Sequence, residues 1–154
     1  MSASFRYVID TNIIIKQFID DPLTPKVNQL LDHLTEPSAE FHVPDLFYVE
    51  CANVLCKYVR ANLYTAEQIA ADLNDLKSLR FQVTPTKHLI VKASEIALRY
   101  GVTAYDSCYV ALSGQVNVPL LTLDKRLFNA LSGSQFNVQL FNDFEVPAVE
   151  KEES

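Results

Sequence analysis

Short apolar runs rich in β-branched and aromatic residues recur along the chain, and longer amphipathic stretches separate them. Runs of this kind are typical of buried strands, while the separating stretches are long enough for crossover helices. The pattern predicts strands over residues 5–9, 41–43, 81–84, 119–123 and 137–141. The alternation therefore predicts an α/β fold whose central sheet is mainly parallel.

The amphipathic stretches predict helices over residues 24–35, 46–60, 66–79, 86–99 and 103–113. Asp45 is a candidate N-cap of the second helix, and Thr65 with Gln68 matches a capping box that opens the third. Gly101 and Gly114 follow the last two helices, where a chain often leaves a helix through a left-handed residue. These signals set the expected ends of the helices.

Composition narrows the class of protein. The 154 residues carry a formal net charge of −6, with 49% hydrophobic and 21% charged residues. We expect one domain over residues 1–145 and an acidic, flexible tail over residues 146–154. The negative charge argues against a broad basic surface for nucleic acid, although bound cations can set a different local potential. No apolar run is long enough for a membrane span or a secretory signal, so a cytoplasmic protein is expected.

Cysteine and histidine give little sign of a site. Cys51, Cys56 and Cys108 form no C-x-x-C pair and lie in apolar helical stretches, where buried reduced thiols are expected. The three histidines lie in different segments without the paired spacing of a helical metal motif. The sequence therefore predicts neither a disulfide framework nor a zinc site.

Four acidic residues lie in or beside apolar segments, where an unpaired carboxylate is costly to bury: Asp10, Glu50, Asp106 and Asp124. Asp10 and Asp124 follow predicted strands, at the edge where open α/β sheets bind their ligands. Glu50 and Asp106 lie on predicted helices and have apolar neighbours at helical spacing. One metal-binding site accounts for all four.

Each acid also has an ordinary explanation that the sequence leaves open. Asp10 and Asp124 can be N-caps between a strand and a helix, and Asp106 can cap its own helix. Glu50 can be solvated, or it can pair with a basic side chain further along its helix, Lys57 or Arg60. All of these separate explanations must be true at once, whereas one metal-binding site explains the four acids together.

The residues around the four acids resemble those of a known family. The matching segments are residues 8–15, 49–55, 103–112 and 121–127. In order and spacing they resemble the PIN-domain nucleases, and within these the VapC-like toxins of type II toxin–antitoxin pairs. The resemblance covers residues 5 to about 141 and implies a three-layer α/β/α sandwich with a central, mainly parallel sheet.

The resemblance also implies residue roles. Four residues match the family's catalytic, metal-binding acids: Asp10, Glu50, Asp106 and Asp124. Asn12 and Thr122 match polar positions that support those carboxylates. Ser107 departs from the pattern, because relatives more often have alanine after the third acid.

The expected chemistry follows from charge. Two carboxylates about 5 Å apart repel by roughly 3 kcal/mol at an effective dielectric near 20, and a divalent cation reverses that penalty. Oxygen ligands suit Mg²⁺ or Mn²⁺ better than zinc. The resemblance implies a metal-dependent endoribonuclease that hydrolyses RNA phosphodiesters by an activated water and leaves 5′-phosphate and 3′-hydroxyl ends.

Contacts to RNA are harder to predict. Lys16, Lys125 and Arg126 lie near the first and last motifs and can meet RNA phosphates, or they can be ordinary solvated helix charges. Four tyrosines can stack on bases, although core packing is the better explanation for them: Tyr48, Tyr58, Tyr105 and Tyr109.

The family resemblance implies two protein partners, a small antitoxin that covers the acidic cleft and a second copy of the chain. Two other functions stay open. A non-catalytic binding module would bind Mg²⁺ without turnover. A phosphatase or phosphotransfer domain would use Asp10 as a phosphoryl acceptor, but Asn12 stands where such an enzyme wants a second aspartate.

Overall fold

The computed structural model describes residues 5–149 of the chain. Within them, five strands form one sheet in the order β3-β2-β1-β4-β5, and every neighbouring pair is parallel. The strands are β1 (Arg6–Ile9), β2 (Glu40–Pro44), β3 (Phe81–Thr84), β4 (Leu120–Thr122) and β5 (Val138–Leu140). Each lies within one residue of its predicted bounds at both ends.

The α-helices are α1 (Thr11–Ile14), α2 (Thr24–Asp32), α3 (Leu46–Arg60), α4 (Ala66–Ser78), α5 (Ile90–Tyr100), α6 (Ala104–Val116) and α7 (Lys125–Ala130). Short 3₁₀ turns follow or precede several of them: η1 (Ile15–Gln17), η2 (His33–Thr35), η3 (Thr86–His88) and η4 (Phe141–Asp143). Among the described residues, no helix is long and apolar enough to cross a membrane.

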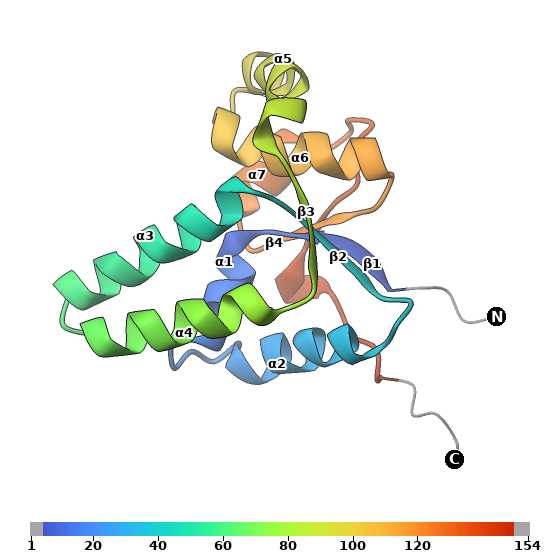
Figure 1. Cartoon of the computed structure of the whole chain (residues 1–154). Helices are drawn as coiled ribbons and strands as arrows, with labels where there is room; N and C mark the ends of the chain where they lie inside the picture. The colour runs from blue at the N-terminus through green and yellow to red at the C-terminus, as the bar shows by residue number, and fades with distance from the viewer. Residues whose placement is uncertain (1–4, 150–154) are drawn as a thin grey trace.

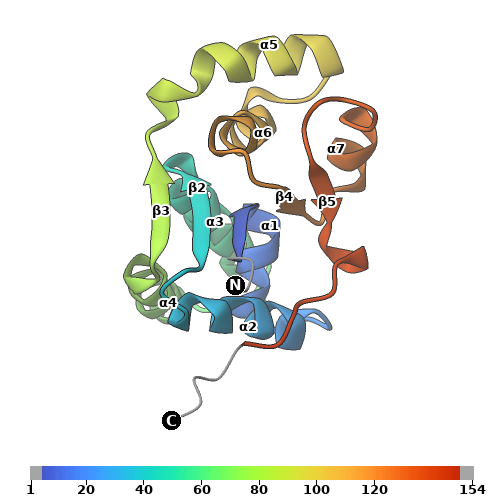
Figure 2. The same cartoon turned by 90° about the vertical axis from the view of Figure 1, so that its right-hand side faces the viewer.

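The helices cover both faces of the sheet. α5, α6 and α7 lie on one side, and α1, α2 and α4 lie on the other (Figure 1 and Figure 2). α6 packs directly on β1, β2 and β4, while α5 packs on α6. Ile9, Phe41 and Leu121 are fully buried in the middle of the sheet. The predicted three-layer α/β/α sandwich is confirmed.

Parallel pairing sets where the site lies. Val8 is in register with His42 on one side and Leu120 on the other, and the Asp10 amide donates to the Leu121 carbonyl at 3.0 Å. All strands therefore end at the same edge. The chain leaves β1 at Asp10, and it leaves β4 two residues before Asp124.

The structure corrects several helix predictions. α2 ends at residue 32 rather than 35 and α5 begins at residue 90 rather than 86, because 3₁₀ turns occupy residues 33–35 and 86–88. α6 runs through Gly114 and ends at Asn117, which adopts the left-handed conformation with φ of 56°. Gly114 is needed for close packing instead, since a Cβ there would lie 2.9 Å from the Phe136 ring. The Asp45 side chain does not cap α3; it accepts hydrogen bonds from the backbone amide and the hydroxyl of Thr86.

Other local predictions are confirmed. Thr65 and Gln68 form the capping box that opens α4. Gly101 ends α5 in the left-handed conformation, with φ of 69°. The short helices α1 and α7, which begin directly after Asp10 and Asp124, were not predicted from the sequence.

The end of the described chain lies against α2. Val146 packs on the core, and His33 Nε2 donates a hydrogen bond to the Pro147 carbonyl at 2.7 Å. Residues 150–154 of the predicted acidic tail lie outside the described residues, so its flexibility stays a prediction.

Candidate active site

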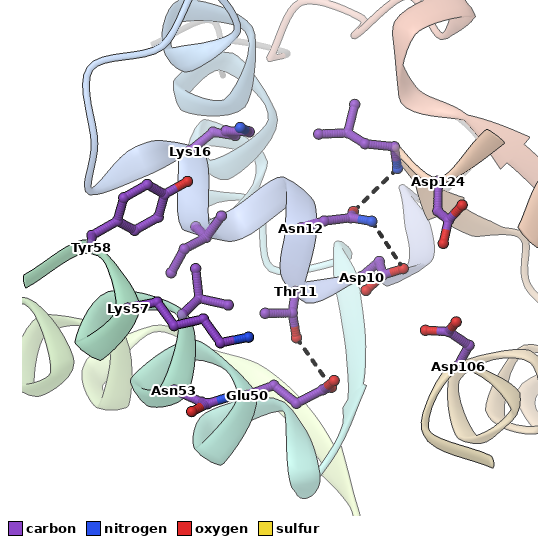
Figure 3. Close-up of a pocket in the computed structure, with 13 residues that line it drawn as sticks. Asp10, Thr11, Asn12, Lys16, Glu50, Asn53, Lys57, Tyr58, Asp106 and Asp124 are labelled. Atoms are coloured by element: carbon purple, nitrogen blue, oxygen red, sulfur yellow. Dashed lines mark hydrogen bonds between the residues drawn. The ribbon is translucent and has the colours of Figure 1, made fainter. Parts of the chain in front are cut away.

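One pocket at the carboxyl edge of the sheet contains all four acids (Figure 3). It has a volume of about 570 Å³. Its lining residues are Asp10, Thr11, Asn12, Ile15, Lys16, Glu50, Asn53, Val54, Lys57, Tyr58, Asp106, Leu123 and Asp124. The fold thus brings together four acids that are up to 114 positions apart in the sequence.

Asp10 lies deepest, with only 6% of its surface exposed. Thr122 Oγ1 donates to its Oδ2 at 2.8 Å, and Asn12 Nδ2 approaches the same oxygen at 3.4 Å. Asn12 is itself held, because its Oδ1 accepts from the Leu123 amide at 3.1 Å and its Nδ2 lies 3.2 Å from Thr122 Oγ1. Asn12 and Thr122 therefore fix the carboxylate from the β4 side.

Burial raises the pKa of Asp10 to about 7, and the negative charges of Asp106 and Glu50 act in the same direction. The Thr122 hydrogen bond opposes the shift. No lysine, arginine or histidine forms an ion pair with Asp10 among the described residues. Asp10 does occupy the N-cap position of α1, but without a side-chain capping hydrogen bond, so capping alone does not account for this residue.

Glu50 enters the pocket from α3 and is held by two hydroxyl groups. Tyr109 donates to Glu50 Oε1 at 2.7 Å, and Thr11 approaches the same oxygen at 3.4 Å. Burial raises the pKa of Glu50, and Asp106 adds repulsion. No ion pair joins Glu50 to Lys57 or Arg60 within residues 5–149, so the salt-bridge explanation is wrong.

Asp106 and Asp124 close the opposite wall. Asp106 lies in the first turn of α6, but the helix is capped by Thr103, whose Oγ1 accepts from the Asp106 amide at 3.1 Å. Burial raises the pKa of Asp106, with a contribution from the charge of Asp124. Asp124 does cap its helix, because Oδ1 accepts from the amides of Arg126 and Leu127 at 2.9 and 3.2 Å. Capping thus explains Asp124 in part, while the same side chain lines the pocket.

The donor set fits a hard divalent cation. Four carboxylates surround one cavity, none of them in an ion pair within residues 5–149, and three of them have raised pKa values. Such a concentration of negative charge is costly unless a cation compensates for it. Within the described part of the chain, no three acidic, histidine or cysteine side chains already form a group that can hold an ion. The carboxylates border the cavity rather than forming a closed coordination sphere.

The predicted basic residues have different environments. Lys16 lines the pocket, but its Nζ pairs with Asp21 Oδ2 at 3.0 Å. Arg126 lines a neighbouring pocket of about 360 Å³ that shares Asp106 and Asp124 with the first. Lys125 is exposed and lines neither pocket.

Sequence reasoning considered Lys57 only as an ion-pair partner of Glu50 and missed it as a residue of the site. It lines the acidic pocket from α3 without an ion pair among the described residues (Figure 3). It lies seven positions after Glu50, two helical turns along the same face, so helical spacing was the signal that could have found it. Thr11 was also missed, although it stands beside Asp10. Ser107 is fully buried and its hydroxyl has no hydrogen-bond partner in the described structure.

The four tyrosines also lie in different environments. Core packing is confirmed for Tyr109, which is 1% exposed, and Tyr48 packs partly buried against the core. Tyr58 packs there too while lining the pocket. The core prediction is wrong for Tyr105, which is 68% exposed.

Comparison with known proteins shows which family has this architecture. The sequence pattern that defines the PIN domain matches residues 7–133. The chain belongs to the PIN-domain family. Among relatives of this PIN domain, Ribonuclease VapC3 of Pyrobaculum aerophilum is 29% identical over 79% of the chain and 92% of its own length.

Two further proteins are similar to this PIN domain. Ribonuclease VapC1 of Mycobacterium tuberculosis is 35% identical over 56% of the chain, which covers 64% of that protein. The crystal structure of VapBC2 from Rickettsia felis, bound to a DNA fragment from their promoter, aligns with a TM-score of 0.63 at 13% identity. That alignment covers 89% of this chain and 99% of the other, and it shows that the fold is shared.

Proposed function

We propose that this PIN domain is a metal-dependent endoribonuclease and the toxin of a type II toxin–antitoxin pair. The observation that carries the proposal is the convergence of Asp10, Glu50, Asp106 and Asp124 on one cavity without basic partners among the described residues. Relatives named as VapC ribonucleases support the nuclease activity. Neighbouring solved structures that contain VapBC complexes support the toxin assignment.

In this proposal the four acids hold Mg²⁺ or Mn²⁺, and the rest of the pocket keeps them in place. When bound, the cation activates a water for in-line attack and stabilises the charge that develops on the phosphodiester. Asp10 is fixed by Thr122 and Asn12, so it presents a rigid ligand to the cavity. The expected products carry 5′-phosphate and 3′-hydroxyl ends.

The remaining lining residues suit RNA. Lys57 supplies a positive charge that no acid of the described structure neutralises, and such a side chain can hold a phosphate next to the one that is cleaved. Lys16 is less available because it is paired with Asp21. Arg126, in the adjoining pocket, can contact the strand beyond Asp106 and Asp124.

The same pocket also suits an antitoxin. Ile15, Val54, Tyr58 and Leu123 line it together with the acids, so a partner segment can bury apolar side chains there and place a basic group among the carboxylates. Self-association of the chain stays a prediction. Phosphoryl transfer through Asp10 fits less well, since that side chain is buried and already held by hydrogen bonds.

The test is cleavage of a mixed RNA pool in Mg²⁺ or Mn²⁺, comparing the wild type with Asp10→Asn and with a sample in EDTA. We expect cleavage by the wild type with metal only, and the ends of the products identify the chemistry. Cleavage that survives Asp10→Asn would show that the activity lies elsewhere. Metal binding by the wild type without cleavage of any RNA would point to the binding module instead.

A further inference from the structure

Tyr109 is a buried polar side chain that the proposed chemistry leaves without a role. It lies on α6, three residues after Asp106, and its side chain is 1% exposed. Its hydroxyl lies 2.7 Å from Glu50 Oε1 on α3 and 2.6 Å from Thr11 Oγ1 on α1. One phenol group therefore joins the three helices that surround the inner end of the pocket.

The direction of each hydrogen bond follows from proton counting. A carboxylate oxygen can only accept, so the single Tyr109 hydroxyl proton goes to Glu50. Thr11 must then donate its own proton to the Tyr109 oxygen. Thr11 Oγ1 also lies 3.4 Å from Glu50 Oε1, and a hydrogen bond of that length is weaker than the one to Tyr109. The result is a directed chain from Thr11 through Tyr109 to Glu50.

Both hydroxyl groups approach the same oxygen of Glu50, Oε1. In the described part of the chain no hydrogen bond reaches Oε2, and no cation pairs with either oxygen. A carboxylate held by hydrogen bonds to one oxygen cannot rotate freely, and the lone pairs of its second oxygen stay available to coordinate a cation. Packing alone does not require this arrangement, because phenylalanine would fill the same volume.

We infer that Tyr109 is a positioning residue: it donates to Oε1 of Glu50 and so presents Oε2 to a divalent cation in the acidic pocket, with Thr11 fixing the phenol. The inference rests on the proposed metal site, and it adds that α6 contributes to that site through Tyr109 as well as through Asp106. Partners that orient metal ligands typically change metal affinity about 10- to 100-fold when they are lost. We expect the lower end here, because Thr11 can turn its proton to Glu50 when the phenol is gone.

The experiment measures Mn²⁺ binding to the purified full chain by titration calorimetry and by loss of the free Mn²⁺ spin-resonance signal. Tyr109→Phe removes only the hydroxyl and should weaken Mn²⁺ binding about 10-fold. Tyr64→Phe is the matched control, since Tyr64 is buried and its hydroxyl has no partner among the described residues. It should leave Mn²⁺ affinity at the wild-type value.

Further variants separate positioning from folding. Thr11→Val should weaken Mn²⁺ binding by a factor of roughly two to three, because Tyr109 still donates to Glu50 but no longer accepts a hydrogen bond from residue 11. Thr11→Ser keeps a hydroxyl at this position and should restore the wild-type affinity. These two variants test the inference even if Tyr109→Phe fails to fold. In RNA cleavage, Tyr109→Phe should raise the Mn²⁺ concentration needed for half-maximal rate and leave KM for RNA unchanged at saturating metal.

The outcomes are distinct. Metal-dependent cleavage by the wild type together with unchanged Mn²⁺ affinity in Tyr109→Phe would overturn the positioning role and leave the proposed function intact. A lowered melting temperature in Tyr109→Phe with wild-type Mn²⁺ affinity would make the phenol merely structural, which also overturns the inference. A wild type that neither binds Mn²⁺ nor cleaves RNA would overturn both.

Discussion

Asp10 shows what burial does to a single acidic side chain. Its carboxylate is enclosed by the sheet and by two other acids, so the proton is held more tightly in the folded chain than in the unfolded one. Glu50 and Asp106 show the same direction of shift for the same main reason. Without a cation, the site is therefore a local source of instability at neutral pH, and the rest of the fold must offset it.

The pH dependence of stability follows from that shift. Because the folded pKa of Asp10 is about 7 and its ordinary value is 3.8, the folded state holds the extra proton between these values. The free energy of unfolding in EDTA should therefore fall as pH rises through this window, by on the order of a few kcal/mol. Asp10→Asn should lose most of this fall and be the more stable protein at pH 8. Urea denaturation between pH 5 and 8 measures it, and equal slopes for the two proteins would contradict it.

Lys57 tests how the pocket binds RNA. Lys57→Ala removes a charge that has no ion-pair partner in the described structure, so KM for RNA should rise several-fold while metal affinity does not fall. Lys16→Ala is the control, because Lys16 is paired with Asp21 and should affect KM less. Steady-state cleavage at several salt concentrations compares them. An equal effect of both substitutions would argue for general attraction rather than a specific contact.

At the scale of elements, the long helices and the strands follow from periodicity, and the two short helices at the site do not. α1 has only four residues and contains two isoleucines, so its composition favours a strand as much as a helix. α7 has six residues, too few for a clear amphipathic pattern. Both helices form because the chain must turn at the end of a buried strand. That requirement comes from the tertiary fold and cannot be predicted from the local sequence.

The end of α6 was mispredicted for a different reason. Gly114 is a good helix terminator when judged by its neighbours, but here it lets the Phe136 ring pack against the helix. Asn117 takes the terminating role three residues later. The ring comes from a segment more than twenty positions away, so tertiary packing decided the end of the helix.

Asp124 both caps α7 and borders the pocket, so two substitutions separate these roles. Asp124→Asn should keep the capping hydrogen bonds and lose RNA cleavage, since asparagine is an equally good N-cap without a charge. Asp124→Ala should also lose about 1 kcal/mol of folding free energy. Thermal unfolding and RNA cleavage on the two variants distinguish the roles. Full activity in Asp124→Asn would mean that this acid serves only the helix.

At the scale of the whole molecule, the candidate site is a product of topology. Sequence pattern predicted a parallel sheet, and parallel strands place Asp10 and Asp124 at one edge. The burial argument also singled out Glu50 and Asp106 on their helices, the family resemblance agreed, and the fold brings all four acids to one cavity. Neither route predicted Tyr109 as a polar partner of Glu50, because a hydroxyl at a core position looks like ordinary packing until the helix opposite is known.

A cation that bridges β1, α3, α6 and α7 should stabilise the whole domain. At a hundred times its dissociation constant, such a ligand adds about 2.7 kcal/mol to the free energy of unfolding. For a chain of 154 residues this corresponds to an increase in melting temperature of roughly 5 to 10 °C. Calorimetry with Mn²⁺ should show this increase in the wild type and not in Asp10→Asn. The same increase in both proteins, or with matched monovalent salt, would exclude a specific site.

The central position of β1 also governs the order in which the chain can fold. The first strand to be synthesised pairs on one side with β4, whose residues emerge more than a hundred positions later. Until then Asp10 has neither Thr122 to hold it nor Asp124 opposite it. If the chain is a ribonuclease, it is harmless for most of its own translation, and the cell meets a competent enzyme only when nearly all of the chain has left the ribosome.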